Sequence, residues 1–277
     1  MIYSILNLLR VKDWLKNIIL FFPLIFSNQL LNTHTYNNLI LAFILFSISA
    51  SFIYVINDIS DIESDKIHPK KKLKKPLANN EISIKFSYLL ILILLILIIF
   101  LTIYTEDLLA HVLAYIAINF IYNFFLKKFA VIDLIIISFG YVIRLDAGST
   151  AILVESSPLM IITVYSLVFF ILSLKRMGEF NLKKNIRESL NFYTQNIFIF
   201  LVSISSFSFL FFFTLFAFTK NNLLIPSLPA IYFLLYRYFK VANIDNGGEF
   251  PIDLFFKDKI LFSISILFII YVIFIYL

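Results

Sequence analysis

Three aspartates in residues 57–65 have the spacing of a metal site. Asp58, Asp61 and Asp65 follow one another at intervals of three and four residues, and Asn57 stands directly before them. At about 100° per residue, the three carboxylates would share one helix face, whereas Glu63 would point away. Carboxylates placed so closely repel one another unless a cation lies among them, and magnesium prefers oxygen ligands. The spacing therefore predicts a magnesium site, and the alternative is a solvated helix end that merely carries charges.

A dense run of lysines follows the aspartates. Residues 68–78 read HPKKKLKKPLA. Such a run is also typical of a topology signal or of a patch that binds anionic lipids. Beside a metal it indicates a diphosphate substrate, because the metal neutralises one part of the diphosphate and ammonium groups hold the rest.

A further charged residue lies inside an apolar stretch. Arg144 falls within residues 130–148, which are otherwise mostly apolar. An arginine within a membrane span is costly and is by default a functional residue. The alternative is a structural role, in which Arg144 pairs with Asp146 or Asp133. Asp133 in turn could be no more than a charge at the start of a helix.

The composition indicates that lipid surrounds the elements that position these residues. Of 277 residues, 61% are hydrophobic and 14% are charged, whereas a soluble domain carries about 25% charged residues. There is no cysteine, which excludes disulfides and thiolate metal ligands. We expect an all-α integral membrane protein, one polytopic domain over residues 1–277, and no nucleic-acid partner. A bilayer core needs about 20 apolar residues per helix, and nine such runs are present: 15–31, 38–56, 84–103, 107–124, 130–148, 158–175, 195–219, 224–240 and 260–277.

The basic residues predict the orientation of these helices. Every Lys and Arg except Arg144 and Lys220 falls in the N-terminal segment, in loops on one side of the predicted membrane, or at the span ends that adjoin them. Cytoplasmic loops are enriched in Lys and Arg. We therefore expect the N-terminus and the aspartate segment on the cytoplasmic side, with the C-terminus outside.

The aspartate segment resembles a known family. Residues 57–69, NDISDIESDKIHP, and residues 75–78, KPLA, are similar to the first signature of the UbiA superfamily of intramembrane prenyltransferases. The resemblance extends over the whole chain. It implies a bundle of nine helices, a cytoplasm-facing cavity and a diphosphate bound through Mg²⁺. Lys75 stands where the family usually has arginine, and Asn79 and Asn80 replace the usual glycine.

Other segments resemble one branch, the decaprenyl-phosphate phosphoribosyltransferases. Aromatic prenyltransferases carry a second aspartate motif after the sixth helix, where this sequence has Lys175, Arg176 and Glu179. The absence of that motif favours a more phosphate-rich donor. The segments that match the branch are RVKDWLKN at 10–17, YNFFLKKFAVID at 122–133, GYVIRLDAG at 140–148 and GEFPIDLFFKDK at 248–259.

The resemblance implies transfer of phosphoribosyl from the soluble donor 5-phosphoribosyl diphosphate to a polyprenyl phosphate in a bacterial cytoplasmic membrane. The implied catalytic residues are Asp58, Asp61, Lys16, Lys127, Asp133 and Arg144. The implied substrate-binding residues are Arg10, Lys12, Asn17, His68, Lys71, Lys75, Tyr122, Lys175, Arg176 and Glu179. The implied metal ligands are Asn57, Asp58, Asp61 and Asp65.

Two other functions stay open at this point. The first is transfer of a polyprenyl group from its diphosphate to an aromatic or other acceptor, with the same metal site. The second is a non-catalytic transporter or lipid-binding membrane protein. A transporter would have polar residues near the membrane midplane, whereas nearly all of those predicted here lie at one side.

Overall fold

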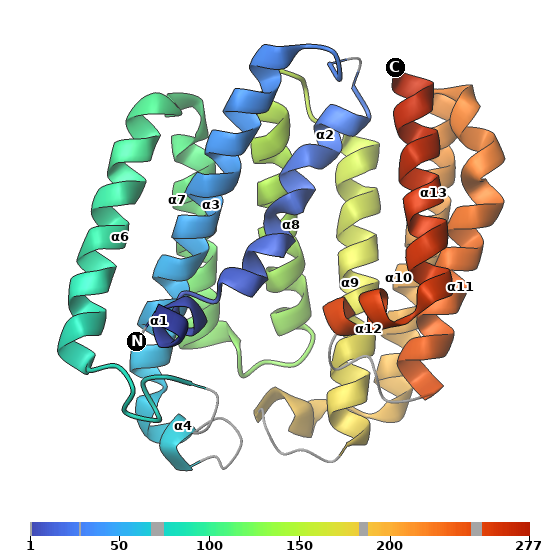
Figure 1. Cartoon of the computed structure of the whole chain (residues 1–277). Coiled ribbons are helices and arrows are strands. Elements are labelled where there is room, and N and C mark those ends of the chain that lie inside the picture. The colour runs from blue at the N-terminus through green and yellow to red at the C-terminus, as the bar shows by residue number, and fades with distance from the viewer. Residues whose placement is uncertain (1, 28, 68–74, 183–187, 245–250) are drawn as a thin grey trace. The chain divides into compact units, whose positions relative to one another are not determined.

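The structure, a computed structural model, is helical in its long elements. It describes residues 2–27, 29–67, 75–182, 188–244 and 251–277, and Figure 1 shows the helices along the chain. Seven helical stretches in the described residues are long and apolar enough to cross a membrane. They are α3 (Thr33–Ser60), α6 (Ile84–Tyr104), Glu106–Leu126, α8 (Ile132–Ala151), α9 (Pro158–Asn181), α10 (Gln195–Lys220) and α13 (Lys259–Tyr276). The prediction of an all-α integral membrane protein is confirmed.

Shorter elements connect or extend these helices. The stretch Glu106–Leu126 is made of a 3₁₀ turn, an α-helix and a π-helix, which are η2 (Glu106–Leu108), α7 (Leu109–Ile121) and η3 (Tyr122–Leu126). The remaining elements are α1 (Ile2–Leu8), η1 (Val11–Phe21), α2 (Phe22–Ile25), α4 (Ile62–Ile67), η4 (Glu188–Phe192), η5 (Asn222–Ser227), α11 (Leu228–Ile244) and α12 (Pro251–Lys257).

The first predicted span, 15–31, is wrong in its boundaries and in its geometry. The helical segment starts earlier, as the 3₁₀-helix η1, and ends with α2 at Ile25. A 3₁₀-helix rises about 2.0 Å per residue and an α-helix about 1.5 Å. The 11 residues of η1 therefore cover about 22 Å, against about 16 Å for the same residues in α-helical form. This geometry lets a short segment extend through much of a bilayer core.

The predicted number of nine spans is not confirmed. Of the two predicted spans outside the seven, one corresponds to η1 and α2, and the other to α11, which has 17 residues. Both are short for a membrane-spanning α-helix of about 20 residues. Nine spans therefore stays a prediction.

Polar residues determine where several long helices begin. The side chains of Asn32, Ser83, Thr194 and Asp258 each accept a hydrogen bond from a backbone N–H in the first turn of the helix that follows. These are the residue types that stabilise helix N-termini. Each of these side chains thus satisfies a backbone N–H that would otherwise be unpaired at the start of an apolar helix.

The helices form two compact units, each made of several chain segments. Unit 1 contains Met1–Pro23, Asn32–Asn123 and Ile143–Val154. Unit 2 contains Leu24–Leu31, Phe124–Val142 and Glu155–Leu277. The prediction of one membrane domain over residues 1–277 stays a prediction.

In unit 1, helix α3 packs against α6, α7 and η1. The C-terminal part of α8 meets the backbone of η1 at Gly148, where a Cβ atom would lie 2.1 Å from the carbonyl oxygen of Leu20. Only a glycine permits so close an approach of a helix to a neighbouring backbone. Only 17% of the apolar window of α6 is buried, so most of this helix is available to lipid.

In unit 2, α9 and α10 form the most extensive helix pair, and α11 packs on α9. The core is rich in aromatic residues, among them Phe170, Phe198, Phe209, Phe213 and Tyr238. Large aromatic side chains bury much apolar area, so this packing stabilises the helix whose end carries Arg176 and Glu179.

Candidate active site

Two of the predicted metal ligands are buried where α3 ends and α4 follows. Asp58 is 2% exposed and Asp65 is 1% exposed, whereas the side chain of Glu63 is 86% exposed. The two helices are separated at Asp61, but the N–H of Asp61 donates to the carbonyl of Asn57 and the N–H of Asp65 donates to that of Asp61, both at 2.9 Å. These bonds preserve the helical phase, so Asp58 and Asp65 are buried and Glu63 points away, as the spacing predicts.

Two basic residues neutralise these carboxylates. The Nη2 of Arg10 lies 2.6 Å from Oδ1 of Asp58, and the Nζ of Lys75 lies 3.0 Å from the same oxygen. Lys75 also donates to Oδ2 of Asp65. Burial by itself would lower the pKa of Arg10, but Asp58, Tyr54 and Asp13 together outweigh burial and raise that pKa above its ordinary value. Arg10 and Lys75, two of the predicted substrate-binding residues, therefore lie against the predicted metal ligands.

The oxygen donors of this cluster suit a hard cation, although one ammonium group and one guanidinium hold them here. Among the described residues, no three His, Cys, Asp or Glu side chains are grouped so that they could hold a metal ion. Carboxylate oxygens are nevertheless the ligands that magnesium prefers, and two of them are buried here. The assignment of Asn57, Asp58, Asp61 and Asp65 as metal ligands stays a prediction. His68 and Lys71, predicted to bind substrate, lie outside the described residues.

A second polar group surrounds Arg144 within unit 1. The Nε of Arg144 donates to Oδ1 of Asn17 at 2.7 Å, and its Nη2 donates to the hydroxyl of Tyr115 at 2.8 Å. The guanidinium carbon lies 4.5 Å from the centre of the Tyr115 ring. The Nδ2 of Asn17 donates to Oγ of Ser47 at 2.9 Å. The structure thus brings together two predicted residues, Arg144 and Asn17, and joins η1, α3, α7 and α8.

A third polar group lies within unit 2 at the start of α8 and the end of α9. Arg176 is 2% exposed; its Nε donates to Oδ2 of Asp133 at 2.8 Å, and its Nη1 donates to Oε2 of Glu179 at 2.9 Å. The hydroxyl of Tyr193 donates to Oδ1 of Asp133 at 3.0 Å. Asp133 therefore pairs with Arg176. Three predicted residues meet in this group.

Sequence reasoning missed Tyr115 and Tyr193, which complete the second and third polar groups. Neither tyrosine belongs to a sequence motif whose spacing would indicate a polar site. Tyr115 is separated from Arg144 by 29 residues, and Tyr193 from Asp133 by 60. Only the packed helices bring such partners together.

The other predicted residues lie on η1, on η3 and the turn after it, and on α9. They are Lys12 and Lys16 on η1, Tyr122 at the start of η3, Lys127 in the turn after η3, and Lys175 on α9. The Nζ of Lys16 lies 2.7 Å from a carboxylate oxygen of Asp13. The π-helical form of η3 is notable because π-helical turns within helices occur often at functional sites.

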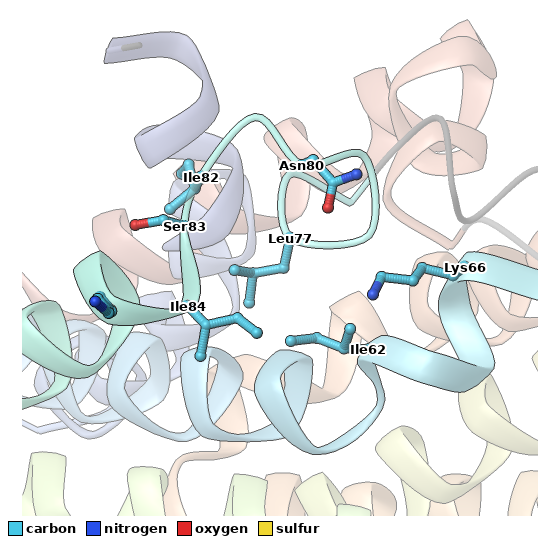
Figure 2. Close-up of a pocket in the computed structure, with 8 residues that line it drawn as sticks. Ile62, Lys66, Leu77, Asn80, Ile82, Ser83 and Ile84 are labelled. Carbon is cyan, nitrogen blue, oxygen red and sulfur yellow. The ribbon is translucent and has the colours of Figure 1, made fainter.

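A cavity of about 400 Å³ lies next to α4, and none of the predicted site residues lines it (Figure 2). Its lining is Ile62, Lys66, Leu77, Asn80, Ile82, Ser83, Ile84 and Lys85. Figure 2 shows Lys66 on α4 facing the loop that carries Leu77 and Asn80. The cavity is therefore a neighbour of the carboxylate cluster and not the cluster itself.

Long apolar helices that enclose ion-paired carboxylates and arginines define a helical membrane protein with a buried polar site. Residues 20–257 match the UbiA prenyltransferase family. The chain belongs to this family, and the predicted relationship is confirmed.

The curated relatives include decaprenyl-phosphate phosphoribosyltransferases. The Mycobacterium tuberculosis enzyme is 26% identical over 94% of this chain and 90% of its own length. The Mycolicibacterium smegmatis enzyme is 29% identical over 94% of this chain and 88% of its own length.

Solved structures of the family share the fold. A UbiA homolog from Archaeoglobus fulgidus bound to DMAPP and Mg²⁺ superimposes with a TM-score of 0.73 at 19% identity, over 99% of both chains. A structure of a digeranylgeranylglyceryl phosphate synthase gives a TM-score of 0.70 at 19% identity, over 99% of this chain and 98% of the other.

Proposed function

We propose that this UbiA-family protein is a magnesium-dependent transferase that moves phosphoribosyl from 5-phosphoribosyl diphosphate to a polyprenyl phosphate. The support is twofold. Relatives that match nearly the whole chain carry the name of that activity. The buried carboxylates of unit 1 lie beside basic residues, as a site for a metal and a diphosphate requires.

The contact of Arg176 with two carboxylates carries the choice of donor. Its guanidinium lies between Asp133 and Glu179 and is hydrogen-bonded to both. A site that held metal ions at both of its ends would need a second acidic group available to a cation. At the end of α9, however, the chain has Lys175 and Arg176 beside a single carboxylate, Glu179, in place of a second aspartate motif. The carboxylates around Asp58 would then serve the metal on one diphosphate.

The proposed reaction is substitution at the anomeric carbon of the ribose. A phosphate oxygen of the lipid forms a bond to this carbon, and the bond from the carbon to the diphosphate oxygen breaks. The diphosphate leaves with the electron pair, through a transition state with oxocarbenium character, as in glycosyl transfer. The acceptor phosphate is already an anion at neutral pH, so the reaction needs no strong general base.

The residues of unit 1 would act mainly through charge. Asn57, Asp58, Asp61 and Asp65 would hold magnesium, which when bound supplies positive charge to the departing diphosphate. Arg10 and Lys75 would bind diphosphate oxygens once the metal has taken their place at the carboxylates. Fixed charges in a water-poor site are worth more than the same charges in water.

A second set of cations would hold the lipid phosphate. These are Lys16, Lys127 and Arg144, with Lys12 and Lys175 as further substrate contacts. Asn17 and Tyr115 orient the guanidinium of Arg144. Its planar N–H donors would therefore bind a phosphate from a fixed direction. Tyr122 would contact substrate from the π-helical turn η3.

The proposed location is a bacterial cytoplasmic membrane with the active site on the cytoplasmic side. The distribution of Lys and Arg along the chain supports this orientation. On that side a soluble diphosphate would reach the protein from water through a cytoplasm-facing cavity. The polyprenyl phosphate would come from the bilayer, with its tail passing sideways through an opening between helices.

The second candidate is transfer of a prenyl group from its diphosphate to an acceptor. The observation in its favour is the fold shared with the A. fulgidus homolog, whose structures hold DMAPP or GPP with Mg²⁺. In this alternative the lipid is the donor, and the same carboxylates would hold the metal.

An assay of the purified protein in lipid nanodiscs separates the two candidates. The protein receives Mg²⁺, labelled 5-phosphoribosyl diphosphate and a polyprenyl phosphate, and the label is followed into the organic phase. A parallel reaction contains a labelled prenyl diphosphate and an aromatic acid. Transfer in the first reaction is expected, whereas transfer in the second reaction alone would overturn the proposal.

A further inference from the structure

The turn between η3 and α8, residues 127–131, is strained at Val131. The N–H of Ile132 donates to the carbonyl of Ala130 at 2.7 Å, which closes a γ-turn around Val131. The φ of Val131 is 66°. A γ-turn with positive φ at its centre is rare and strained, and a β-branched residue in this region is an outlier. Such a conformation persists only where surrounding contacts hold it, and it is typical of functional sites.

The hydroxyl of Tyr193 holds this turn from a distant part of the chain. The N–H of Val131 donates to that hydroxyl at 2.7 Å, and the hydroxyl donates to Oδ1 of Asp133 at 3.0 Å. The ring of Tyr193 stacks on Phe198 with centroids 4.6 Å apart and planes 11° apart. Burial first, and then the Asp133 carboxylate, raise the pKa of Tyr193. The hydroxyl therefore keeps its proton and can donate and accept together.

The other side of Asp133 extends the same network. Its Oδ2 accepts from Arg176, which also donates to Glu179. The start of α8 and the end of α9 are thus joined through Asp133 and Arg176. Tyr193 adds the backbone of the strained turn to this network.

We infer that Tyr193 is a positioning residue, which fixes the turn so that Lys127 and Lys128 can bind the phosphate group of the lipid acceptor. The identity of that acceptor rests on the proposed function. A lysine is a point charge on a flexible stem, so the position of the turn's backbone decides where both ammonium groups can reach. The strain at Val131 and the distant hydroxyl that holds it are the two observations that carry the inference.

Three variants separate positioning from simple core packing. Tyr193→Phe keeps the stacked ring and removes the hydroxyl. Tyr238→Phe is the matched control, because Tyr238 is also buried in unit 2 and its hydroxyl has no hydrogen-bond partner among the described residues. Val131→Gly relieves the strain, because glycine adopts positive φ without steric cost; it is made alone and together with Tyr193→Phe.

Tyr193→Phe removes the hydrogen bonds to both Val131 and Asp133, and it is expected to raise the KM for the polyprenyl phosphate about tenfold. The KM for the diphosphate donor should stay unchanged, whereas loss of folded protein would lower the apparent kcat and leave both KM values as they are. Val131→Gly in the Tyr193→Phe background should restore most of the lipid KM. Hydrogen–deuterium exchange of the peptide over residues 127–133 should rise in Tyr193→Phe and not in Tyr238→Phe.

An unchanged lipid KM in Tyr193→Phe, or no restoration by Val131→Gly, would overturn the inference. If neither Tyr193→Phe nor the double variant folds, Tyr193 serves core packing and the inference also fails. A wild-type protein without transfer to polyprenyl phosphate would overturn the proposed function instead. In that event the exchange measurement still decides whether Tyr193 holds the turn, because it needs no substrate.

Discussion

The Nζ of Lys75 lies 3.0 Å from Oδ1 of Asp58 and within hydrogen-bond distance of Asp65. One ammonium group therefore bridges two buried carboxylates that are predicted to bind magnesium. A metal ion bound by these carboxylate oxygens would displace the ammonium group of Lys75 from them. Metal binding would release Lys75 to meet the anion that arrives with the metal, so the two ligands should bind cooperatively.

Replacement of Lys75 by methionine tests this competition. Without diphosphate, Lys75→Met should bind Mn²⁺, used as a spectroscopic substitute for magnesium, at least about fivefold more tightly than wild type, which is the lower end of typical coupling between sites. Its affinity for inorganic diphosphate in the presence of metal should fall. Electron paramagnetic resonance of free Mn²⁺ measures the first effect, and calorimetry measures the second.

The matched control is Lys66→Met, because Lys66 pairs with the exposed Glu63 at 3.1 Å. This variant should leave both affinities unchanged. Weaker Mn²⁺ binding by Lys75→Met in the absence of diphosphate would mean that Lys75 does not compete with the metal.

Arg144→Lys should impair lipid binding while the protein stays folded. Lysine keeps the positive charge but cannot donate in fixed directions to both Asn17 and Tyr115. The KM for the polyprenyl phosphate should rise about tenfold or more. Arg237→Lys serves as the control, because Arg237 makes its two hydrogen bonds to Asp258 in unit 2. An equal KM for the polyprenyl phosphate in Arg144→Lys and wild type would mean that Arg144 does not bind the lipid phosphate.

Gly148→Ala should destabilise unit 1. The added Cβ would lie 2.1 Å from the carbonyl oxygen of Leu20, so α8 and η1 would have to move apart. Overpacking of this kind costs about 1–3 kcal/mol. The unfolding temperature in detergent should fall, and Leu113→Ala, at an exposed position of α7 in unit 1, should leave it nearly unchanged. An unaltered unfolding temperature in Gly148→Ala would show that α8 and η1 do not pack so closely.

The ion pair of Asp258 with Arg237 should make the stability of the folded protein depend on pH. Hydrogen bonds from Arg237 lower the pKa of Asp258 below its ordinary value, burial opposes them, and the N–H of Leu261 adds a further bond that lowers it. Because the folded-state pKa is the lower one, the stabilisation is present above the unfolded-state pKa of about 3.9 and is lost as the pH falls through the folded-state value.

Asp258→Asn should therefore lower the unfolding temperature at pH 7, and its difference from wild type should shrink below about pH 4. Asp253→Asn, at an exposed position of α12, provides the control. A difference between Asp258→Asn and wild type that stays constant down to pH 3 would contradict this origin of the stability.

Hydropathy and spacing predict much of this fold because both are local properties of the chain. Seven long apolar helices follow from run lengths that match a bilayer. The burial of Asp58 and Asp65 with Glu63 outside follows from helical periodicity. The 3₁₀ geometry of η1 could not be predicted in this way, because an apolar run has the same hydropathy in either type of helix.

The partners of the buried charges depend on the packed helices. Arg10 meets Asp58 across 48 residues, and Val131 meets Tyr193 across 62. No spacing rule links residues so far apart. The candidate residues could thus be named from the sequence, whereas the pairing of Lys75 with two carboxylates and of Arg176 with Asp133 required the structure.

The mass of the lipid product tests the proposed function most directly. The protein in nanodiscs receives Mg²⁺, 5-phosphoribosyl diphosphate, a prenyl diphosphate, a polyprenyl phosphate and an aromatic acid in one reaction, and the extracted lipids are analysed by mass spectrometry. With the wild-type protein, we expect the mass of polyprenyl phosphate to increase by one phosphoribosyl group. With folded Asp58→Asn, we expect no such product. A prenylated aromatic acid as the sole product, or an unchanged yield with Asp58→Asn, would contradict the account.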